Sequence, residues 1–145
     1  MRWQDVFLDD ESMWPTEHRV TLPSRHADAR GAIQPLVDLP IRNVSLITSK
    51  KGSVRSNHYH LTDWHFIFVL AGSFDYYFRP ARDMDAPQRL RIETGEMLFT
   101  PPMEEHATVF LEDSQLLVIS RNVRDQDVYE ADVRRVQLID PDRGG

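Results

Sequence analysis

The sequence predicts an all-β domain, a sandwich or barrel of short strands, and three observations lead to that prediction. From position 33 onward, short runs rich in β-branched and aromatic residues alternate with turn residues, at a spacing of about 8 to 12 residues. No convincing amphipathic helix accompanies these runs, since the one candidate, 125–135, is rich in valine and charge. The length of 145 residues suits one hydrophobic core.

Nine runs carry the strand pattern. They are 33–37, 44–49, 55–60, 65–70, 74–79, 88–92, 97–100, 107–111 and 116–120. Glycines at 52, 72 and 95 lie between runs, and the segment 80–87, which contains two prolines, is predicted to be a loop. The run 66–70 is apolar on both faces, which predicts a strand buried on both sides or an outer face covered by a partner.

The chain divides into three parts. Residues 1–30 are polar and interrupted by Pro15 and Pro23, which predicts an irregular N-terminal arm. Residues 31–140 form the predicted barrel, and residues 141–145 a flexible tail.

Composition excludes several classes of function. The net charge is −6 and the chain has only two lysines, adjacent in sequence, so no clustered basic face predicts a nucleic-acid partner. No apolar run is long enough to cross a bilayer, and the N-terminus lacks the pattern of a secretory signal. We therefore expect a cytoplasmic protein without a membrane partner. The chain has no cysteine, so a transition-metal site would have to use His, Asp or Glu.

Four of the six histidines form a candidate metal site. His58 and His60 alternate with Tyr59, so on a strand both point to one face. His65 opens the next run, where a hairpin would bring it back beside the pair, and a later strand could add His106. Neutral imidazoles are good ligands for Zn, Fe, Ni and Mn. The pattern therefore predicts a divalent transition metal; the alternative is a set of unrelated core or surface histidines.

The spacing around these histidines resembles that of the cupin superfamily. Gly52, five residues, His58-Tyr59-His60, four residues, His65, six residues and Gly72 match the first cupin motif, with His65 where an acid is usual. The second motif follows as Gly95, five residues, Pro101-Pro102-Met103, two residues and His106, with Met103 in place of a glycine and Phe110 in place of a frequent asparagine. The resemblance implies a double-stranded β-helix (a jelly-roll barrel) with the metal inside its mouth.

A narrower resemblance concerns function. The segment Arg55-Ser56-Asn57-His58-Tyr59-His60 is similar to one in sugar-nucleotide cupins, namely the dTDP-4-dehydrorhamnose 3,5-epimerases and the cupin domains of capsular polysaccharide assembly proteins; Ser56 replaces a usual glycine. Upstream, Asp28-Ala29-Arg30-Gly31 resembles the segment that opens their barrels. The resemblance implies an isomerase or epimerase that acts on a keto sugar through an enolate, with Arg30 and Arg55 on substrate phosphate.

Such chemistry needs a base, a proton donor and a group that stabilises the enolate. Tyr76 or Tyr77 is the candidate donor. In the metal-free epimerases of this group the base occupies the position of His58, which cannot be both ligand and free base.

Other readings stay open at this stage. An all-histidine site equally suits an Fe(II)-dependent dioxygenase, and a non-catalytic cupin that binds a small ligand is a third possibility. Glu104 and Glu105 are predicted to lie in a solvated turn. A homodimer is expected, with the N-terminal arm exchanged between copies.

Overall fold

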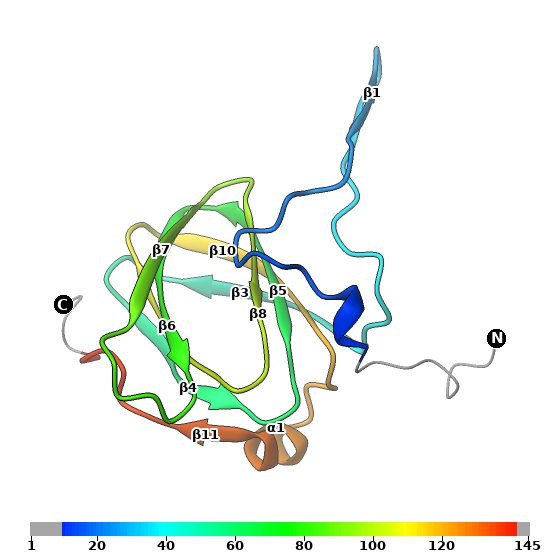
Figure 1. Ribbon diagram of the computed structural model, residues 1–145. Helices are drawn as coiled ribbons and strands as arrows, with labels where there is room; N and C mark the ends of the chain where they lie inside the picture. The colour runs from blue at the N-terminus through cyan, green and yellow to red at the C-terminus, as the bar shows by residue number, and fades with distance from the viewer. Residues whose placement is uncertain (1–9, 142–145) are drawn as a thin grey trace.

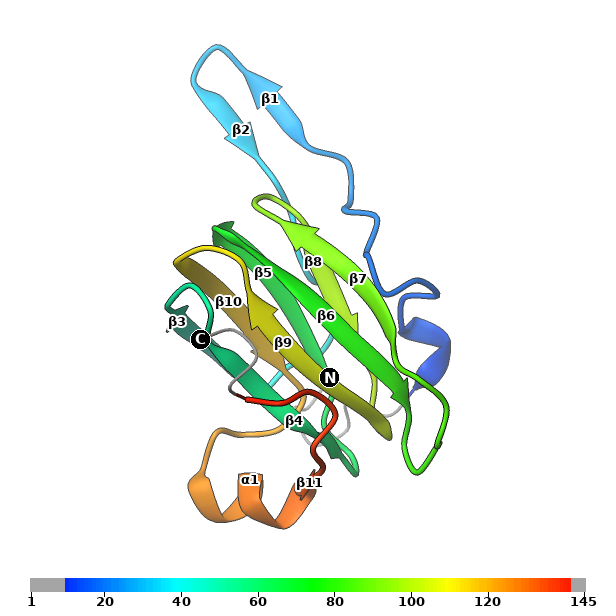
Figure 2. The same ribbon diagram turned by 90° about the vertical axis from the view of Figure 1, so that its left-hand side faces the viewer.

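Two antiparallel sheets face each other and close into a barrel in the computed structural model, which describes residues 10–141 (Figures 1 and 2). The four-stranded sheet has the order β3-β10-β5-β8, with bounds Asn43–Ser49, Ser114–Ser120, His65–Ala71 and Met97–Thr100. The five-stranded sheet has the order β11-β4-β9-β6-β7, with bounds Val133–Arg135, Val54–His60, Glu104–Phe110, Ser73–Pro80 and Gln88–Glu93. The predicted all-β, double-stranded β-helix fold is confirmed.

Eight of the nine predicted strands overlap the strands β3 to β10. The run 33–37 is wrong, because the chain leaves its short strand at Ile33 and continues irregularly through Pro35, a residue that has no N–H for a strand ladder. The single α-helix of the described part, α1 (Gln126–Asp132), falls inside the candidate segment 125–135. Asp125 caps it by accepting hydrogen bonds from the backbone N–H groups of Asp127 and Val128.

Alternation along β6 decides which side chains enter the barrel. Phe74, Tyr76 and Phe78 point inward and pack in the main core with residues of β5, β7, β8, β9 and β10. Tyr77, between them, points to the outer face of the five-stranded sheet, where it packs against Ala107 and Ile139.

Part of the outer face of the four-stranded sheet is covered by the chain itself. Phe66, Phe99 and neighbours form a second cluster, against which apolar residues of the N-terminal arm pack: Trp14, Val20, Leu22, Leu36, Val37, Leu39 and Ile41. The run 66–70 is therefore a central strand covered on both sides, with the chain's own arm as the outer cover.

The arm also contains a hairpin that stands away from the barrel (Figures 1 and 2). Its strands β1 (His26–Asp28) and β2 (Gly31–Ile33) pair with each other, and every residue in them is exposed. A 3-10 turn, η2 (Glu11–Met13), precedes it. At the opposite end of the molecule α1 lies below β4 (Figure 2). Within residues 10–141, no helix is long and apolar enough to cross a membrane.

Candidate functional site

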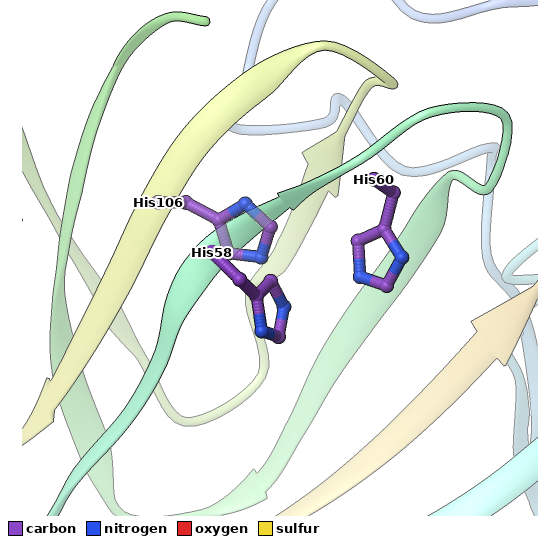
Figure 3. A group of neighbouring side chains, drawn as sticks. All are labelled: His58, His60 and His106. Atoms are coloured by element: carbon purple, nitrogen blue, oxygen red, sulfur yellow. The ribbon is translucent and has the colours of Figure 1, made fainter. Parts of the chain in front are cut away.

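The four predicted histidines meet inside the barrel. His58 on β4 lies directly opposite His106 on β9, and His65 opens β5 across the interior. The ring centroid of His58 lies 4.7 Å from that of His60 and 4.8 Å from that of His106, and the ring centroids of His60 and His65 are 4.8 Å apart. Figure 3 shows His58, His60 and His106 turned toward a common space.

A bulge in β4 turns the histidines inward. The β4–β9 register shifts between Ser56 and His58, and Ser56 and Asn57 have φ values of 73° and 55°. Asn57 is held in this left-handed conformation by its side chain, whose Oδ1 accepts hydrogen bonds from the N–H groups of Leu138 and Ile139. The φ of Ser56 explains why glycine suits that position. Met103, also in place of a glycine, has a φ of 59°.

Burial keeps the four imidazoles neutral. The pKa of His58 is lowered by burial and then by the neighbouring imidazoles, and that of His65 falls well below its usual value for the same reasons. Burial lowers the pKa of His106 to about 4. Burial also lowers the pKa of His60, although the Asp132 carboxylate opposes the shift. At neutral pH all four rings therefore present lone pairs, the form that accepts a proton or a metal ion.

Three of the four histidines have a hydrogen-bond partner at Nδ1. The Nδ1 of His60 lies 3.2 Å from the Asp132 carboxylate, that of His65 lies 2.8 Å from the Ser120 hydroxyl, and that of His106 lies 3.0 Å from the backbone oxygen of Glu104. His58 differs, because neither of its nitrogens has a hydrogen-bond partner among residues 10–141. Such outer partners fix the tautomer of a ligating imidazole and aim its Nε2.

Two buried carboxylates support this cluster. Asp132, at the end of α1, accepts hydrogen bonds from the backbone N–H and hydroxyl of Thr62 and from the backbone N–H of Asp63. Asp63 accepts one from the backbone N–H of Asn122 and lies beside His65. Burial raises the pKa of Asp63 to about 6. The pKa of Asp132 is lowered: burial alone would raise it, but the hydrogen bonds from Thr62 and Asp63 outweigh that effect.

The residues present could hold a metal. The ligand atoms of His58, His60 and His106 lie within 4.8 Å of one another, and those of His60, Asp63 and His65 do so as well, all from buried residues. Imidazole nitrogens and a carboxylate are the ordinary ligands of zinc and iron when thiolates are absent.

A cavity of about 140 Å³ adjoins the cluster. All four histidines line it, together with Tyr129 of α1 and two arginines, Arg55 and Arg124. The guanidinium of Arg124 stacks 4.2 Å above the Tyr129 ring and pairs with no carboxylate within residues 10–141. Arg55 also lines a second, open cavity of about 750 Å³, and its guanidinium donates hydrogen bonds to the Ser49 hydroxyl and the Thr48 backbone oxygen.

The other predicted site residues lie in different places. Tyr76 is buried inside the barrel, stacked at 5.9 Å on the His106 ring, and donates a 2.6 Å hydrogen bond to Glu104. Tyr77 lies on the outer face of the sheet, away from the cavity. Arg30 lies at the tip of the projecting hairpin, 89% exposed, and pairs with Asp28.

Glu104 and Glu105 do not form a solvated turn, and that prediction is wrong. Both are buried residues of β9. Glu104 accepts from Tyr76 and pairs with His18 of the arm at 2.7 Å, while Glu105 pairs with Arg79. Two adjacent acids of one strand can both be buried because each has such a partner.

Sequence reasoning missed Asp63, Asp132, Arg124 and Tyr129. Asp63 lies in the turn between two histidine-bearing strands, and this position beside His65 was a usable signal. The other three lie in 123–132, whose weak helical pattern gave no indication that it folds back against the barrel.

Comparison with known proteins places the fold. No family model matches the chain, and no curated protein does. Among solved structures, it is similar to the QdtA 3,4-ketoisomerase from Thermoanaerobacterium thermosaccharolyticum in complex with TDP (TM-score 0.62, 24% identity, 77% of this chain and 82% of that chain). It is also similar to dTDP-4-dehydrorhamnose 3,5-epimerase from Sulfolobus tokodaii (TM-score 0.63, 21% identity, 82% and 77%).

A third similar structure is the capsular polysaccharide assembling protein CapF from Staphylococcus aureus (TM-score 0.59, 23% identity). The match covers 80% of this chain but 34% of CapF. The chain thus has the cupin fold. The solved structures it is similar to in shape are sugar-nucleotide cupins, as the resemblance of its motifs predicts.

Proposed function

We propose that this chain is a metal-binding enzyme that isomerises or epimerises a keto sugar carried on a nucleotide, through an enolate. One observation carries the proposal: four neutral, buried imidazoles line a small cavity in a barrel of the sugar-nucleotide cupin shape. A proton beside a sugar carbonyl is acidic enough for such a base to remove, provided that the charge on the enolate oxygen is stabilised.

His58 is the proposed base. It lines the cavity, it is neutral, and it lacks the hydrogen bond that would commit either nitrogen. Its ring can therefore take a proton from a bound sugar and return it at the neighbouring carbon. His58 then does not have to be both metal ligand and base, because the ligand role falls to histidines whose Nδ1 atoms have a hydrogen-bond partner.

The proposed cofactor is a divalent transition metal bound within this cluster by ligands other than His58; His60 belongs to both groups of ligand atoms that lie close enough together to share an ion. When bound, such an ion supplies a Lewis acid for the enolate oxygen. Asp132 and Ser120 orient the imidazoles of His60 and His65 for that role.

The two cavities that share Arg55 are proposed to hold the two parts of a sugar nucleotide. At about 140 Å³ the histidine cavity is smaller than a pocket for a whole drug-sized ligand, roughly 300–1,000 Å³, so it takes one end of the molecule. Arg55, shared with the larger cavity, and Arg124, which has no carboxylate partner in the described part of the chain, are placed to hold a diphosphate between the two parts. Of the two tyrosines only Tyr76 stays in the proposal, because Tyr77 faces outward. Tyr76 does not line the cavity and donates its hydroxyl proton to Glu104, so its proposed part is to position His106, on which its ring stacks.

The proposal also includes a homodimer. Ile33 of the hairpin and Val44, Leu46 and Leu70 of the four-stranded sheet are exposed apolar side chains. Arg30 does not line the cavity of its own chain, so a part for it in phosphate binding requires the hairpin to reach a second copy.

Deuterium exchange tests the function. The protein, loaded with Zn²⁺, is incubated with TDP-4-keto-6-deoxyglucose in D₂O and followed by NMR. Deuterium incorporation beside the carbonyl, lost in His58→Gln, is the expected result. Absence of exchange would overturn the proposal. Oxygen uptake with bound iron would instead support the dioxygenase alternative, and nucleotide-sugar binding without turnover would support a binding module.

A further inference from the structure

Among the ring nitrogens of the cluster, those of His60 and His65 lie within hydrogen-bond distance of each other. Their Nε2 atoms lie 3.3 Å apart, and both residues are buried. On the far side of each ring, Nδ1 is engaged, by the Asp132 carboxylate for His60 and by the Ser120 hydroxyl for His65. Since His60 donates its Nδ1–H to Asp132, its Nε2 carries a lone pair that points at His65.

A buried carboxylate completes this arrangement. The Oδ2 of Asp63 lies 3.6 Å from the Nε2 of His65, and the ligand atoms of His60, Asp63 and His65 all lie within 4.8 Å of one another. The other oxygen of Asp63, Oδ1, is used by the backbone N–H of Asn122, so Oδ2 faces the two rings. The backbone N–H of Asp63 is in turn held by Asp132, the residue that orients His60.

The spacing matches that of a metal's ligand shell. Two ligand atoms of a tetrahedral zinc site lie about 3.4 Å apart, because each bond to nitrogen is about 2.0–2.1 Å long. The distances of 3.3 and 3.6 Å around His65 Nε2 are close to that value. Two nitrogens and one carboxylate oxygen, each with an outer partner, form a three-ligand set that leaves a fourth position for water or substrate.

We propose that His60, Asp63 and His65 form the divalent metal position of this chain, with Asp63 as its anionic ligand. The inference rests on the proposed function and deepens it. It places the ion at the end of the cluster nearest Asp63, and it leaves His58 and His106 as free imidazoles that face the substrate. Because His60 belongs to both possible ligand groups, one ion at a time can bind, here or between His58, His60 and His106.

The arrangement has one metal-free counterpart. If His65 carries its proton on Nε2, it donates that proton to His60 Nε2, and a hydrogen-bond chain from Ser120 through both rings to Asp132 satisfies every group. In that case Asp63 would serve only to brace its turn. The two cases predict different metal contents for the purified protein.

Metal titration of the full-length protein separates them. The stripped protein is titrated with Co²⁺, followed by the visible absorption of the bound ion, and its Zn²⁺ content is measured after dialysis. The wild type is expected to bind one equivalent. Asp63→Asn, which keeps an oxygen for the Asn122 N–H, and His65→Ala should lose more affinity than the roughly 10- to 100-fold cost of changing an outer partner. His58→Ala and His106→Ala should keep affinity within about threefold.

Asp75→Asn is the matched control, because Asp75 is an equally buried carboxylate on β6 that pairs with Arg91 outside the site. Thermal melts of the stripped variants show whether each one folds. Loss of the ion in His58→Ala and His106→Ala with retention in Asp63→Asn would overturn the proposal in favour of the three-histidine group, and no ion in the wild type would favour the hydrogen-bond chain. Deuterium exchange on the same samples reports separately on the function: a bound ion without exchange contradicts the enzyme and leaves the metal position standing.

Discussion

The two ends of the histidine cluster differ in how their side chains are held. All four rings line the cavity, but at one end His60 and His65 are each fixed by an outer hydrogen bond and lie beside buried Asp63. At the other end, His58 has no such partner within residues 10–141. The comparison shows that residues of one type can be suited to different roles. An imidazole whose orientation is fixed by a hydrogen bond suits a metal ligand, whereas an imidazole without such a bond suits a general base.

Replacing the free ring should give the largest effect on turnover. His58→Gln is expected to lower kcat for deuterium exchange by about 100- to 10,000-fold, the range for loss of a general base, while metal content stays unchanged. The measurement is exchange by NMR beside metal analysis of the same sample. Loss of both the metal ion and the activity in this variant would contradict the assignment of His58 as a base that does not bind the metal.

Acid should destabilise the metal-free cluster. The pKa of His106 falls from 6.5 to about 4 on folding, so its contribution to stability is complete above about pH 6.5 and is lost as the pH falls. Between pH 7 and pH 4 this loss is on the order of 3 kcal/mol. Asp63 acts in the opposite direction: its raised pKa of about 6 means that its protonation near that pH recovers part of the loss.

Urea unfolding of the stripped protein at pH 7, 6, 5 and 4 measures this dependence. His106→Gln should flatten the curve. An equal slope in wild type and variant would show that the pH dependence arises elsewhere.

Removing the orienting carboxylate tests the end of the cluster beside Asp63. Asp132→Asn should weaken metal binding by roughly 10- to 100-fold, because the amide no longer offers His60 a charged acceptor. Co²⁺ titration gives the affinity. Thermal melting serves as the control, since Asp132 also holds the Thr62 turn, and unchanged affinity in a folded variant would refute the orienting role.

A smaller effect is expected from Arg124 in the cavity wall. Arg124→Met keeps much of the contact with the Tyr129 ring but removes the charge, and should weaken TDP binding by about 10-fold, as expected for one exposed charge-assisted contact at the lower end of the range of roughly 1.5–3 kcal/mol. Calorimetry with TDP measures it. Arg134→Met is the control, because Arg134 contacts only backbone carbonyls near the same helix. Equal losses in the two variants would argue against a specific role.

The smallest expected effect is on stability. Ser56→Gly should stabilise the fold by up to about 1 kcal/mol, because a residue with a φ of 73° adopts that conformation more easily as glycine. The gain is limited, since glycine also adds entropy to the unfolded chain. Chemical denaturation at neutral pH detects it, and a destabilised variant would mean that the Ser56 side chain contributes more than its backbone costs.

The sequence allowed the barrel and its four inward histidines to be predicted because both depend on local rules. Strand alternation places His58 and His60 on one face, and glycine-marked turns set the strand lengths. The choice between Tyr76 and Tyr77 was left open although the same rule applies to it: Phe74, Tyr76 and Phe78 share one face of the strand, whereas Asp75, Tyr77 and Arg79 share the other, so alternation predicts that Tyr76 enters the core.

Contacts between residues far apart in the sequence could not be predicted from local rules either. Asp132 meets His60 across 72 positions of sequence, through a helix of seven residues with little periodic signal. Glu104 was misplaced for a related reason, since its partners His18 and Tyr76 are distant in sequence and make its burial possible. Charged residues are assigned to the surface by default, and only the fold reveals the partners that overturn that default.

The α1 segment lies outside the barrel sheets, yet it contributes Arg124 and Tyr129 to the cavity wall and Asp132 to the support of His60. Under the proposed function, selectivity for the ligand and strength of ion binding therefore depend together on one short stretch, residues 124–132. Exchanging that stretch for another would alter both properties at once while leaving the β-strands that carry the imidazoles untouched.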